Sequence, residues 1–171
     1  GAGIQADLKT FSVFGTYGAS VITALTAQNT LGVTGVHKVP AAFIVAQFDA
    51  VTNDLKIAAT KTGMLGDEET VRTVARLISA AKLYPVVVDP VMVATSGDVL
   101  LAQDAIAAVL TLMLPLAALI TPNLPEAARL LDKPVATTDA AAQRQAEELL
   151  QFGCGGVLLK GGHGQGVESV D

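Results

Sequence analysis

The apolar residues of the chain alternate between a helical spacing and short continuous runs. Ile4, Leu8 and Phe11 recur at helical intervals and predict a first helix, which Gly15 ends. The run of valines at 86–88 predicts a buried strand. The same rules predict strands at 20–27, 36–39, 57–61, 86–88, 118–121 and 157–160, and helices that begin near residues 4, 40, 67, 105, 124 and 138.

Most of the predicted strands are apolar throughout instead of alternating with polar residues. Strands of this kind are buried on both faces, as in a parallel sheet covered by helices. Strands and helices follow one another without a linker or an internal repeat, and 171 residues suit one domain. We therefore predict a single α/β domain over residues 1–171. Because the chain opens directly on a predicted helix, we expect it to lack a first strand, and a further segment at its other end.

Composition and charge exclude several classes of protein. The chain has 11 Lys and Arg against 16 Asp and Glu, a net charge of −5, and this acidic balance argues against a general nucleic-acid binder. No apolar run reaches the roughly 18–20 residues that a membrane-spanning helix needs. The single Cys154 cannot form an intramolecular disulfide, which favours a reducing, cytoplasmic location.

Polar or glycine-rich residues end four successive predicted strands. They are Lys61, Asp89, Asn123 and Lys160. In an open parallel sheet, the carboxyl ends of the strands lie along one edge, and ligands bind there. The sequence therefore predicts that the functional site lies at this edge, before the ligand is known.

The Lys160 segment has two interpretations. A lysine followed by Gly161 and Gly162 presents an ammonium and bare backbone N–H groups, which suits phosphate oxygens. The alternative is a glycine-rich turn with a surface lysine. The spacing of a Walker A loop is absent, so the segment does not predict a nucleotide site of that type.

Asn123 and Glu126 also allow two interpretations. Their spacing, with Pro125 between them, is typical of a capping box at the start of a helix. Alternatively, Glu126 holds Mg²⁺ and Asn123 helps to order phosphates, since Mg²⁺ needs only one or two protein carboxylates. Both interpretations are compatible, because a helix start at a sheet edge is also a favourable place for an anion.

Other polar residues are weaker candidates. Asp7 is either a solvated acid on the first helix or a ligand-binding group beside a glycine-rich helix start. Gln28 is either part of a polar turn or able to read the edge of a heterocycle. His163 follows the Lys160 glycines and is a candidate phosphate contact. Cys154 is interpreted as a packing residue, because no neighbour in the sequence would stabilise its thiolate.

Six motifs occur in an order that is similar to a known family. GAGIQADLKTF, SVITALTAQNTLGV, KTGMLG, VVVDPVMVATSGD, LITPNLPEA and VLLKGGH run from residue 1 to 163. Together they resemble the hydroxymethylpyrimidine/phosphomethylpyrimidine kinases of thiamine biosynthesis, which are members of the ribokinase-like superfamily. The series AQNT, DPVM, TPNLPEA and KGGH is specific, whereas each motif alone is weak.

The resemblance implies a three-layer fold with a mostly parallel central sheet. It also implies transfer of the ATP γ-phosphate to 4-amino-5-hydroxymethyl-2-methylpyrimidine and then to its monophosphate, with Mg²⁺, in a homodimer. Positioning and charge stabilisation carry most of such phosphoryl transfer. The implied substrate-binding residues are Asp7, Gln28, Met64 and Val91, the implied metal-binding residues are Asp89 and Glu126, and the implied phosphate-binding residues are Asn123, Glu126 and Lys160, with Lys160 also catalytic.

The chain departs from this family in two respects. It lacks a downstream Gly-Thr-Gly-Cys turn, which supplies the residue that activates the substrate hydroxyl, so we expect the 171 residues alone to be inactive. Thr95 stands where the family often has lysine. Two alternatives therefore stay open, a pyridoxal or pyridoxine kinase and a truncated ligand-binding module without catalysis, although Gln28 and Met64 favour the pyrimidine.

Overall fold

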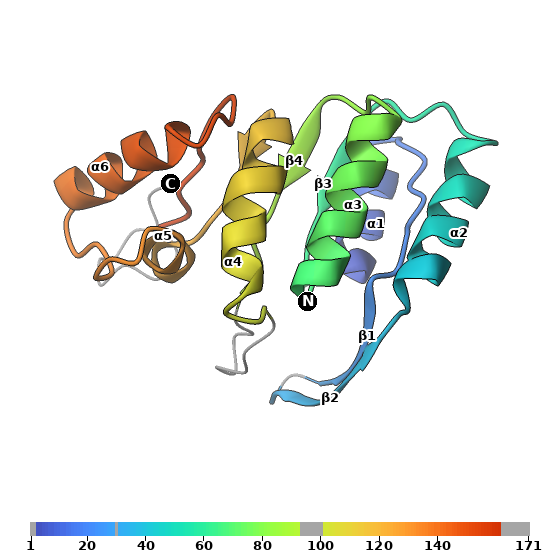
Figure 1. The fold of residues 1–171 in the computed structure, drawn as a ribbon, viewed down its shortest axis with the longest axis horizontal. Helices are drawn as coiled ribbons and strands as arrows, with labels where there is room; N and C mark the ends of the chain where they lie inside the picture. The colour runs from blue at the N-terminus through green and yellow to red at the C-terminus, as the bar shows by residue number, and fades with distance from the viewer. Residues whose placement is uncertain (1–2, 30, 93–100, 162–171) are drawn as a thin grey trace.

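The computed structural model describes residues 3–29, 31–92 and 101–161, which form two sheets and a set of helices (Figure 1). Two of the helices begin at a capping side chain, because Asp67 and Thr138 accept hydrogen bonds from the backbone N–H groups of Thr70 and Ala141. The elements are α1 (Ile4–Val13), β1 (Ala24–Gln28), β2 (Val33–Lys38), α2 (Ala41–Thr52), β3 (Thr60–Thr62), α3 (Glu68–Ala80), β4 (Val86–Val88), α4 (Ala105–Ala108), which continues as a π turn (Val109–Met113) and a 3-10 turn (Leu114–Leu116), β5 (Leu119–Ile120), α5 (Leu124–Leu130) and α6 (Asp139–Leu150).

The main sheet is parallel, as predicted, with the strand order β3-β4-β5. The predicted fourth strand at 157–160 is wrong as a continuous strand among the described residues. Its backbone makes only two isolated parallel bridges to the β5 region, Ile120 to Val157 and Asn123 to Lys160. These bridges nevertheless place Lys160 beside Asn123, so both residues lie at one edge of the sheet, as predicted.

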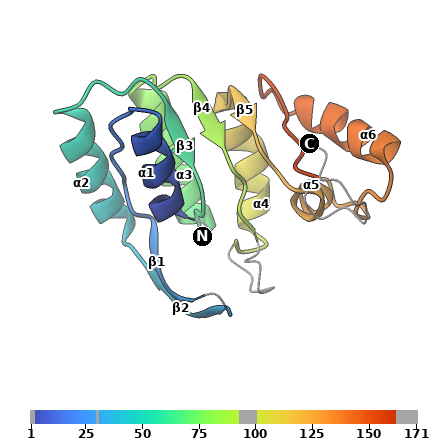
Figure 2. The same ribbon diagram turned by 180° about the vertical axis from the view of Figure 1, so that it is seen from behind.

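Helices lie on both sides of β3 in the parallel sheet. Figures 1 and 2 show α3 and α4 on one face and α1 over the opposite face of β3. The N-terminal ends of α1 and α3 lie at the same edge of the sheet, the carboxyl edge of β3 (Figure 1). This arrangement brings helix starts and strand ends together, which is where the sequence predicts the site.

The core lies between the parallel strands and the helices α3 and α4. Val86 and Val88 of β4 are 0% and 1% exposed, and Val71 and Ile78 of α3 pack in the same cluster. Burial of this apolar surface supplies much of the stabilisation of the fold. Val87, which points to the other face of β4, is only half-buried, so the predicted burial is complete on one face of this strand. The short valine run is therefore the structural centre that fixes Asp89, the residue that follows it.

The predicted strands at 20–27 and 36–39 form a separate antiparallel hairpin, β1–β2. Ala24 pairs with Lys38 at its base, and the pairing shifts by one residue at Gln28. The hairpin extends away from the parallel sheet (Figure 1), and most of its residues are exposed. The prediction that the strands are buried on both faces is therefore wrong for this pair.

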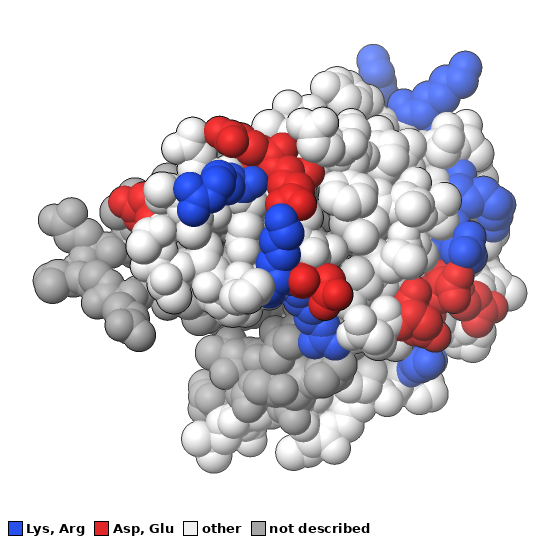
Figure 3. Space-filling view, turned by 60° about the vertical axis from the view of Figure 1, so that its left-hand side comes forward, with Lys and Arg blue, Asp and Glu red and all other residues white. Residues whose placement is uncertain are grey.

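Charges of both signs are mixed on the surface. On the face shown in Figure 3, several of the described Lys and Arg side chains lie next to Asp and Glu side chains, and together they form no continuous basic surface. Within the described ranges, no helix is both long enough and apolar enough to span a bilayer.

Candidate functional site

The carboxyl end of β4 carries an ion pair. Asp89 follows Val88, and its Oδ1 accepts a hydrogen bond from Lys160 Nζ at 2.9 Å. Backbone bonds fix both residues, because Asp89 N donates to Thr62 O and Lys160 N donates to Pro122 O. Two residues that the sequence placed at the same edge of the sheet are therefore joined by a charged contact.

A second lysine extends this contact to the first helix. Lys61 Nζ, in the middle of β3, lies 2.9 Å from Asp7 Oδ2 and 3.7 Å from Asp89 Oδ2. Asp7 belongs to the first turn of α1, whose N-cap is Gly3 with φ 81°. We call Asp7, Lys61, Asp89 and Lys160 the charge array.

The charge array is balanced and partly withdrawn from water. Two carboxylates face two ammonium groups, and the side chains are 30% exposed for Asp7, 29% for Lys61, 18% for Asp89 and 37% for Lys160. At this exposure each pair gains little stability, because solvent screens it and ordering long side chains costs entropy. The array is therefore better explained as preorganised charge at the sheet edge than as a source of stability.

Asn123 and Glu126 form the capping box predicted from their spacing. Asn123 Oδ1 accepts from Glu126 N, and Glu126 Oε2 accepts from Asn123 N, both at 2.8 Å. Glu126 is only 5% exposed. Burial raises the pKa of Glu126, although hydrogen bonds from the backbone of Asn123 and Met92 and the charge of Lys160 oppose this shift.

The carboxylates of Asp89 and Glu126 are the groups that suit Mg²⁺. Glu126 belongs to the helix that begins beside Lys160, and the charge of Asp89 acts on it. In the described part of the chain, no three or more His, Cys, Asp or Glu residues gather to hold a metal by themselves. Two carboxylates fit Mg²⁺ bound together with phosphate, because this ion keeps several waters and uses few protein ligands.

The remaining predicted substrate residues differ in burial and in the elements that carry them. Met64 is half-buried beyond the end of β3, and its carbonyl accepts a hydrogen bond from Thr23 Oγ1 at 2.7 Å. Val91 is half-buried two residues beyond Asp89. Gln28 is exposed at the end of β1 on the hairpin, where its Oε1 accepts from Thr26 Oγ1 at 3.4 Å. The structure thus brings Asp7 to the array but leaves Gln28 on a separate element.

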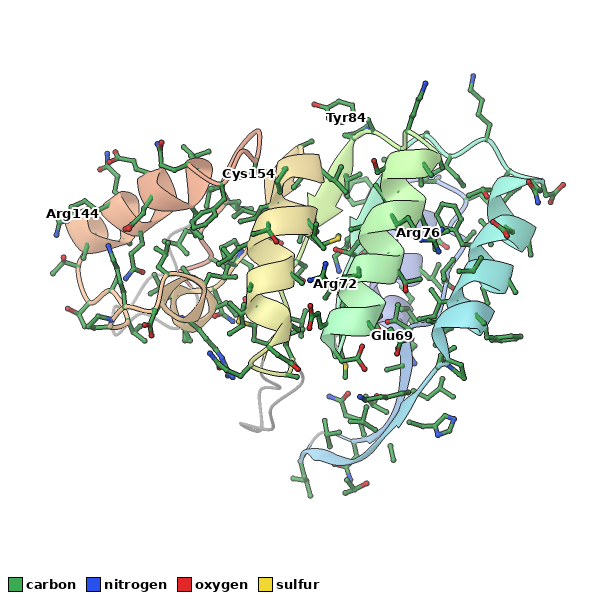
Figure 4. All side chains as sticks on the ribbon, in the orientation of Figure 1. Glu69, Arg72, Arg76, Tyr84, Arg144 and Cys154 are labelled. Atoms are coloured by element: carbon green, nitrogen blue, oxygen red, sulfur yellow. The ribbon has the colours of Figure 1, made fainter. Side chains whose placement is uncertain are left out.

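Cys154 lies away from the carboxyl edge. It is 7% exposed, its Sγ donates to Leu149 O at 3.6 Å, and burial raises the pKa of its thiol. Figure 4 shows Cys154 and Tyr84 toward the opposite end of the molecule from Glu69, which lies in the first turn of α3. These observations support the interpretation of Cys154 as a packing residue, because a buried thiol with a raised pKa is a poor nucleophile.

Sequence reasoning placed Lys61 at a strand end but assigned it no role. The sequence did contain a signal for a functional role of Lys61. Lys61 lies where a predicted buried strand ends, just before Thr62 and Gly63, and Asp89 likewise lies at the end of the valine run. The contact with Asp7 could not be predicted, because it joins residues 54 positions apart. His163 and Thr95 lie outside the described residues.

Comparison with known sequences identifies the family. A sequence model of the family described as phosphomethylpyrimidine kinase matches residues 1–171. The chain belongs to the phosphomethylpyrimidine kinase family. It is 52% identical over 171 residues to hydroxymethylpyrimidine/phosphomethylpyrimidine kinase of Escherichia coli (strain K12) and 53% identical to that of Rhizobium meliloti (strain 1021). In each case the match covers 100% of this chain and 64% of the relative, so the chain spans less than two thirds of their length.

Solved structures of family members and neighbours share the fold. The crystal structure of phosphomethylpyrimidine kinase from Clostridium difficile 630 superposes with a TM-score of 0.89 at 44% identity, covering 100% of this chain and 73% of that one. Pyridoxal kinase from Staphylococcus aureus in complex with AMP-PCP and pyridoxal gives a TM-score of 0.87 at 31% identity, covering 99% and 61%. The prediction of a ribokinase-like α/β fold is confirmed.

Proposed function

We propose that the complete natural protein is an ATP-dependent kinase of thiamine biosynthesis. It transfers the γ-phosphate of ATP to the hydroxymethyl group of 4-amino-5-hydroxymethyl-2-methylpyrimidine, and then a second phosphate to the monophosphate. The observation that carries the proposal is the charge array, which joins a carboxylate of α1 to two lysines and a carboxylate at the ends of parallel strands. Membership of the phosphomethylpyrimidine kinase family supports the choice of substrate.

The array has one end for the pyrimidine and one for the phosphates. Asp7 accepts hydrogen bonds from the aminopyrimidine, and Gln28, Met64 and Val91 complete its recognition. Lys160 donates to the transferring phosphoryl group, where charge spreads over its oxygens during transfer. Asn123 lies beside Lys160 and helps to order the phosphates.

The reaction needs one bond formed and one broken. The hydroxyl oxygen of the substrate bonds to the γ-phosphorus, the bond from that phosphorus to the β–γ bridging oxygen breaks, and ADP leaves with the electron pair. The hydroxyl proton passes to a base, to which we assign none of the described residues. Asp89 and Glu126 would hold Mg²⁺, which when bound neutralises phosphate charge.

The direct test is turnover by the complete natural protein. We expect phosphate transfer from ATP to the hydroxymethylpyrimidine with a kcat/KM at least about a hundredfold above that for pyridoxal, because binding groups matched to one heterocycle leave unpaired polar groups against the other. Phosphate transfer is followed by coupled release of ADP and by mass spectrometry of the product. Absence of pyrimidine turnover together with good pyridoxal turnover would contradict the substrate assignment.

Two alternatives are distinguished by the same assay. The likeness to pyridoxal kinase at 31% identity makes pyridoxal the second candidate substrate, but the hydroxymethylpyrimidine kinases are more similar in sequence, at 52% and 53% identity. A ligand-binding module without catalysis would bind the pyrimidine in calorimetry but release no ADP.

Three further expectations accompany the proposal. A polypeptide limited to these 171 residues is expected to have little activity, since it matches 64% of the length of its relatives. Assay of that polypeptide beside the complete protein tests this expectation. The homodimer and the cytoplasmic location stay predictions from the sequence, and sedimentation of the complete protein tests the first of them.

A further inference from the structure

We propose that Lys61 is a positioning residue that fixes Asp7 for recognition of the pyrimidine. This inference rests on the proposed function and extends it to a residue to which that function gives no role. The geometry is the main argument, since Lys61 Nζ lies 2.9 Å from Asp7 Oδ2 and 3.7 Å from Asp89 Oδ2.

The backbone of Lys61 is held by the sheet. Thr60, Lys61 and Thr62 pair in parallel register with Val86, Val87 and Val88 of β4. Side chains alternate along a strand, so Lys61 points to the opposite face from Thr62, which is 7% exposed. Helix α1 lies over that opposite face (Figures 1 and 2), so the ammonium group is directed at Asp7 by the strand itself.

A lysine is an unfavourable residue at this place. Lysine is depleted in strands, and a charge partly withdrawn from water is costly unless it is paired. The ion pair does not recover much stability at the observed exposure of about one third. Residues that break a local rule without an evident gain in stability are expected at functional sites.

Lys61 and Lys160 hold different carboxylates of the charge array. Asp89 is held by Lys160 at 2.9 Å and only weakly by Lys61, whereas the described contacts of Asp7 include one ion pair, the one with Lys61. Loss of the Lys61 charge therefore frees Asp7 and leaves Asp89 paired. We expect the main effect on binding of the pyrimidine, and a small effect on binding of ATP.

The test uses Lys61→Met and Lys61→Arg in the complete natural protein. Lys61→Met is expected to raise KM for the hydroxymethylpyrimidine about tenfold, the size expected for losing a hydrogen bond to a charged group, and to change KM for ATP by no more than about twofold. Lys61→Arg keeps the charge and is expected to recover most of the pyrimidine KM. Lys133→Met is the matched control, because it also breaks an exposed ion pair, with Glu148, that contains no residue of the array.

A double-mutant cycle separates positioning from a general loss of stability. If Lys61 acts through Asp7, the effects of Asp7→Asn and Lys61→Met on the pyrimidine KM do not multiply, and the double variant is close to the worse single variant. A purely structural role would instead lower the unfolding midpoint, affect both substrates equally and give multiplying effects. Those results would overturn the inference.

The remaining outcomes are also decisive. If the wild type phosphorylates the pyrimidine and Lys61→Met has an unchanged KM for it, this inference is overturned but the proposed function is not. Wild type that does not phosphorylate the pyrimidine overturns both this inference and the proposed function. If Lys61→Met does not fold, as judged by circular dichroism, Lys61→Gln and Lys61→Arg replace it, and a normal pyrimidine KM in Lys61→Gln counts against the inference.

Discussion

Lys160 Nζ donates to Asp89 Oδ1 at 2.9 Å although the two residues are 71 positions apart in the sequence. The contact exists because β4 and the segment before Gly161 run parallel on either side of the β5 region, so that their ends meet at one edge. The same edge holds the start of α5 with Glu126. The pair is therefore the link between the valine-rich core and the proposed phosphate site.

Removal of the Lys160 charge should reduce the rate of phosphate transfer. In the complete natural protein, Lys160→Met is expected to lower kcat about 100-fold to 1,000-fold, because a preorganised donor to developing charge typically contributes this much. Steady-state kinetics with the hydroxymethylpyrimidine measure the effect, and Lys133→Met serves as the control for loss of a lysine in an ion pair. A kcat within about threefold of wild type would exclude the assigned role of Lys160.

Removal of the Asp89 charge should weaken the response to Mg²⁺. Asp89→Asn keeps the shape of the side chain, and we expect it to raise the Mg²⁺ concentration for half-maximal activity about 10-fold to 100-fold, as groups around a metal commonly do. Titration of activity with Mg²⁺ at fixed ATP measures the shift. Asp139→Asn, an exposed acid in the first turn of α6, should leave the titration unchanged. Equal Mg²⁺ dependence in both variants would remove Asp89 from the metal site.

The buried carboxylate of Glu126 should cost stability at neutral pH. Burial raises its pKa above the ordinary value of 4.5, so the folded protein binds a proton that the unfolded chain releases as the pH rises. The contribution of Glu126 to the free energy of unfolding is therefore most favourable below pH 4.5. It is lost as the pH rises through the folded-state pKa. Glu126→Gln keeps an acceptor for Asn123 N and is expected to unfold at a higher temperature than wild type at pH 8.

Thermal unfolding across pH tests this expectation. The difference in unfolding temperature between Glu126→Gln and wild type should shrink toward zero as the pH falls below 4.5. Glu69→Gln, on the exposed side of α3, is the control and should track wild type at every pH. A gap that is constant with pH would show that the ionisation of Glu126 is not its cause. The same Gln variant should lose kinase activity if Glu126 also holds Mg²⁺.

The sequence predicted the elements and the edge on which the site lies. The helical spacing of the apolar residues and the capping residues were sufficient to predict α3 and α5, where Asp67 and Asn123 accept the expected backbone hydrogen bonds. The carboxyl-edge argument was sufficient to group Asp89 with Lys160, because parallel strands fix where their ends lie. These inferences succeed since each depends on local chemistry or on one topological rule.

The remaining features depend on contacts that no local pattern contains. The hairpin β1–β2 follows from pairing between strands on either side of a loop, and the apolar residues of 20–27 gave no sign that it lies outside the parallel sheet. The segment 157–160 is apolar like a full strand, yet only two bridges form. The pairing of Lys61 with Asp7 depends on how α1 packs over β3, which is a tertiary relationship.

Gly155 should be required for the segment that delivers Lys160. A Cβ at Gly155 would lie 2.8 Å from the carbonyl oxygen of Ala118, a backbone atom just before β5 that cannot move aside, and Gly155 N donates to Ala117 O at 2.9 Å. Gly155→Ala is therefore expected to lower the free energy of unfolding by about 1–3 kcal/mol, as overpacking commonly does. Urea unfolding measures the loss.

The neighbouring Gly156 provides the matched control for this prediction. A Cβ at Gly156 would meet Leu119 Cδ1 at 3.5 Å and Ala118 O at 3.7 Å, which are ordinary contacts, so Gly156→Ala should unfold within about 1 kcal/mol of wild type. Because Gly155 is five residues before Lys160 on the same segment, a shift forced at Gly155 should also move Lys160 relative to Asp89 and lower kcat. Equal urea midpoints for the two alanine variants would show that the segment adjusts freely, and the position of Lys160 would then have to be fixed by its pairing with Asn123 and Asp89 alone.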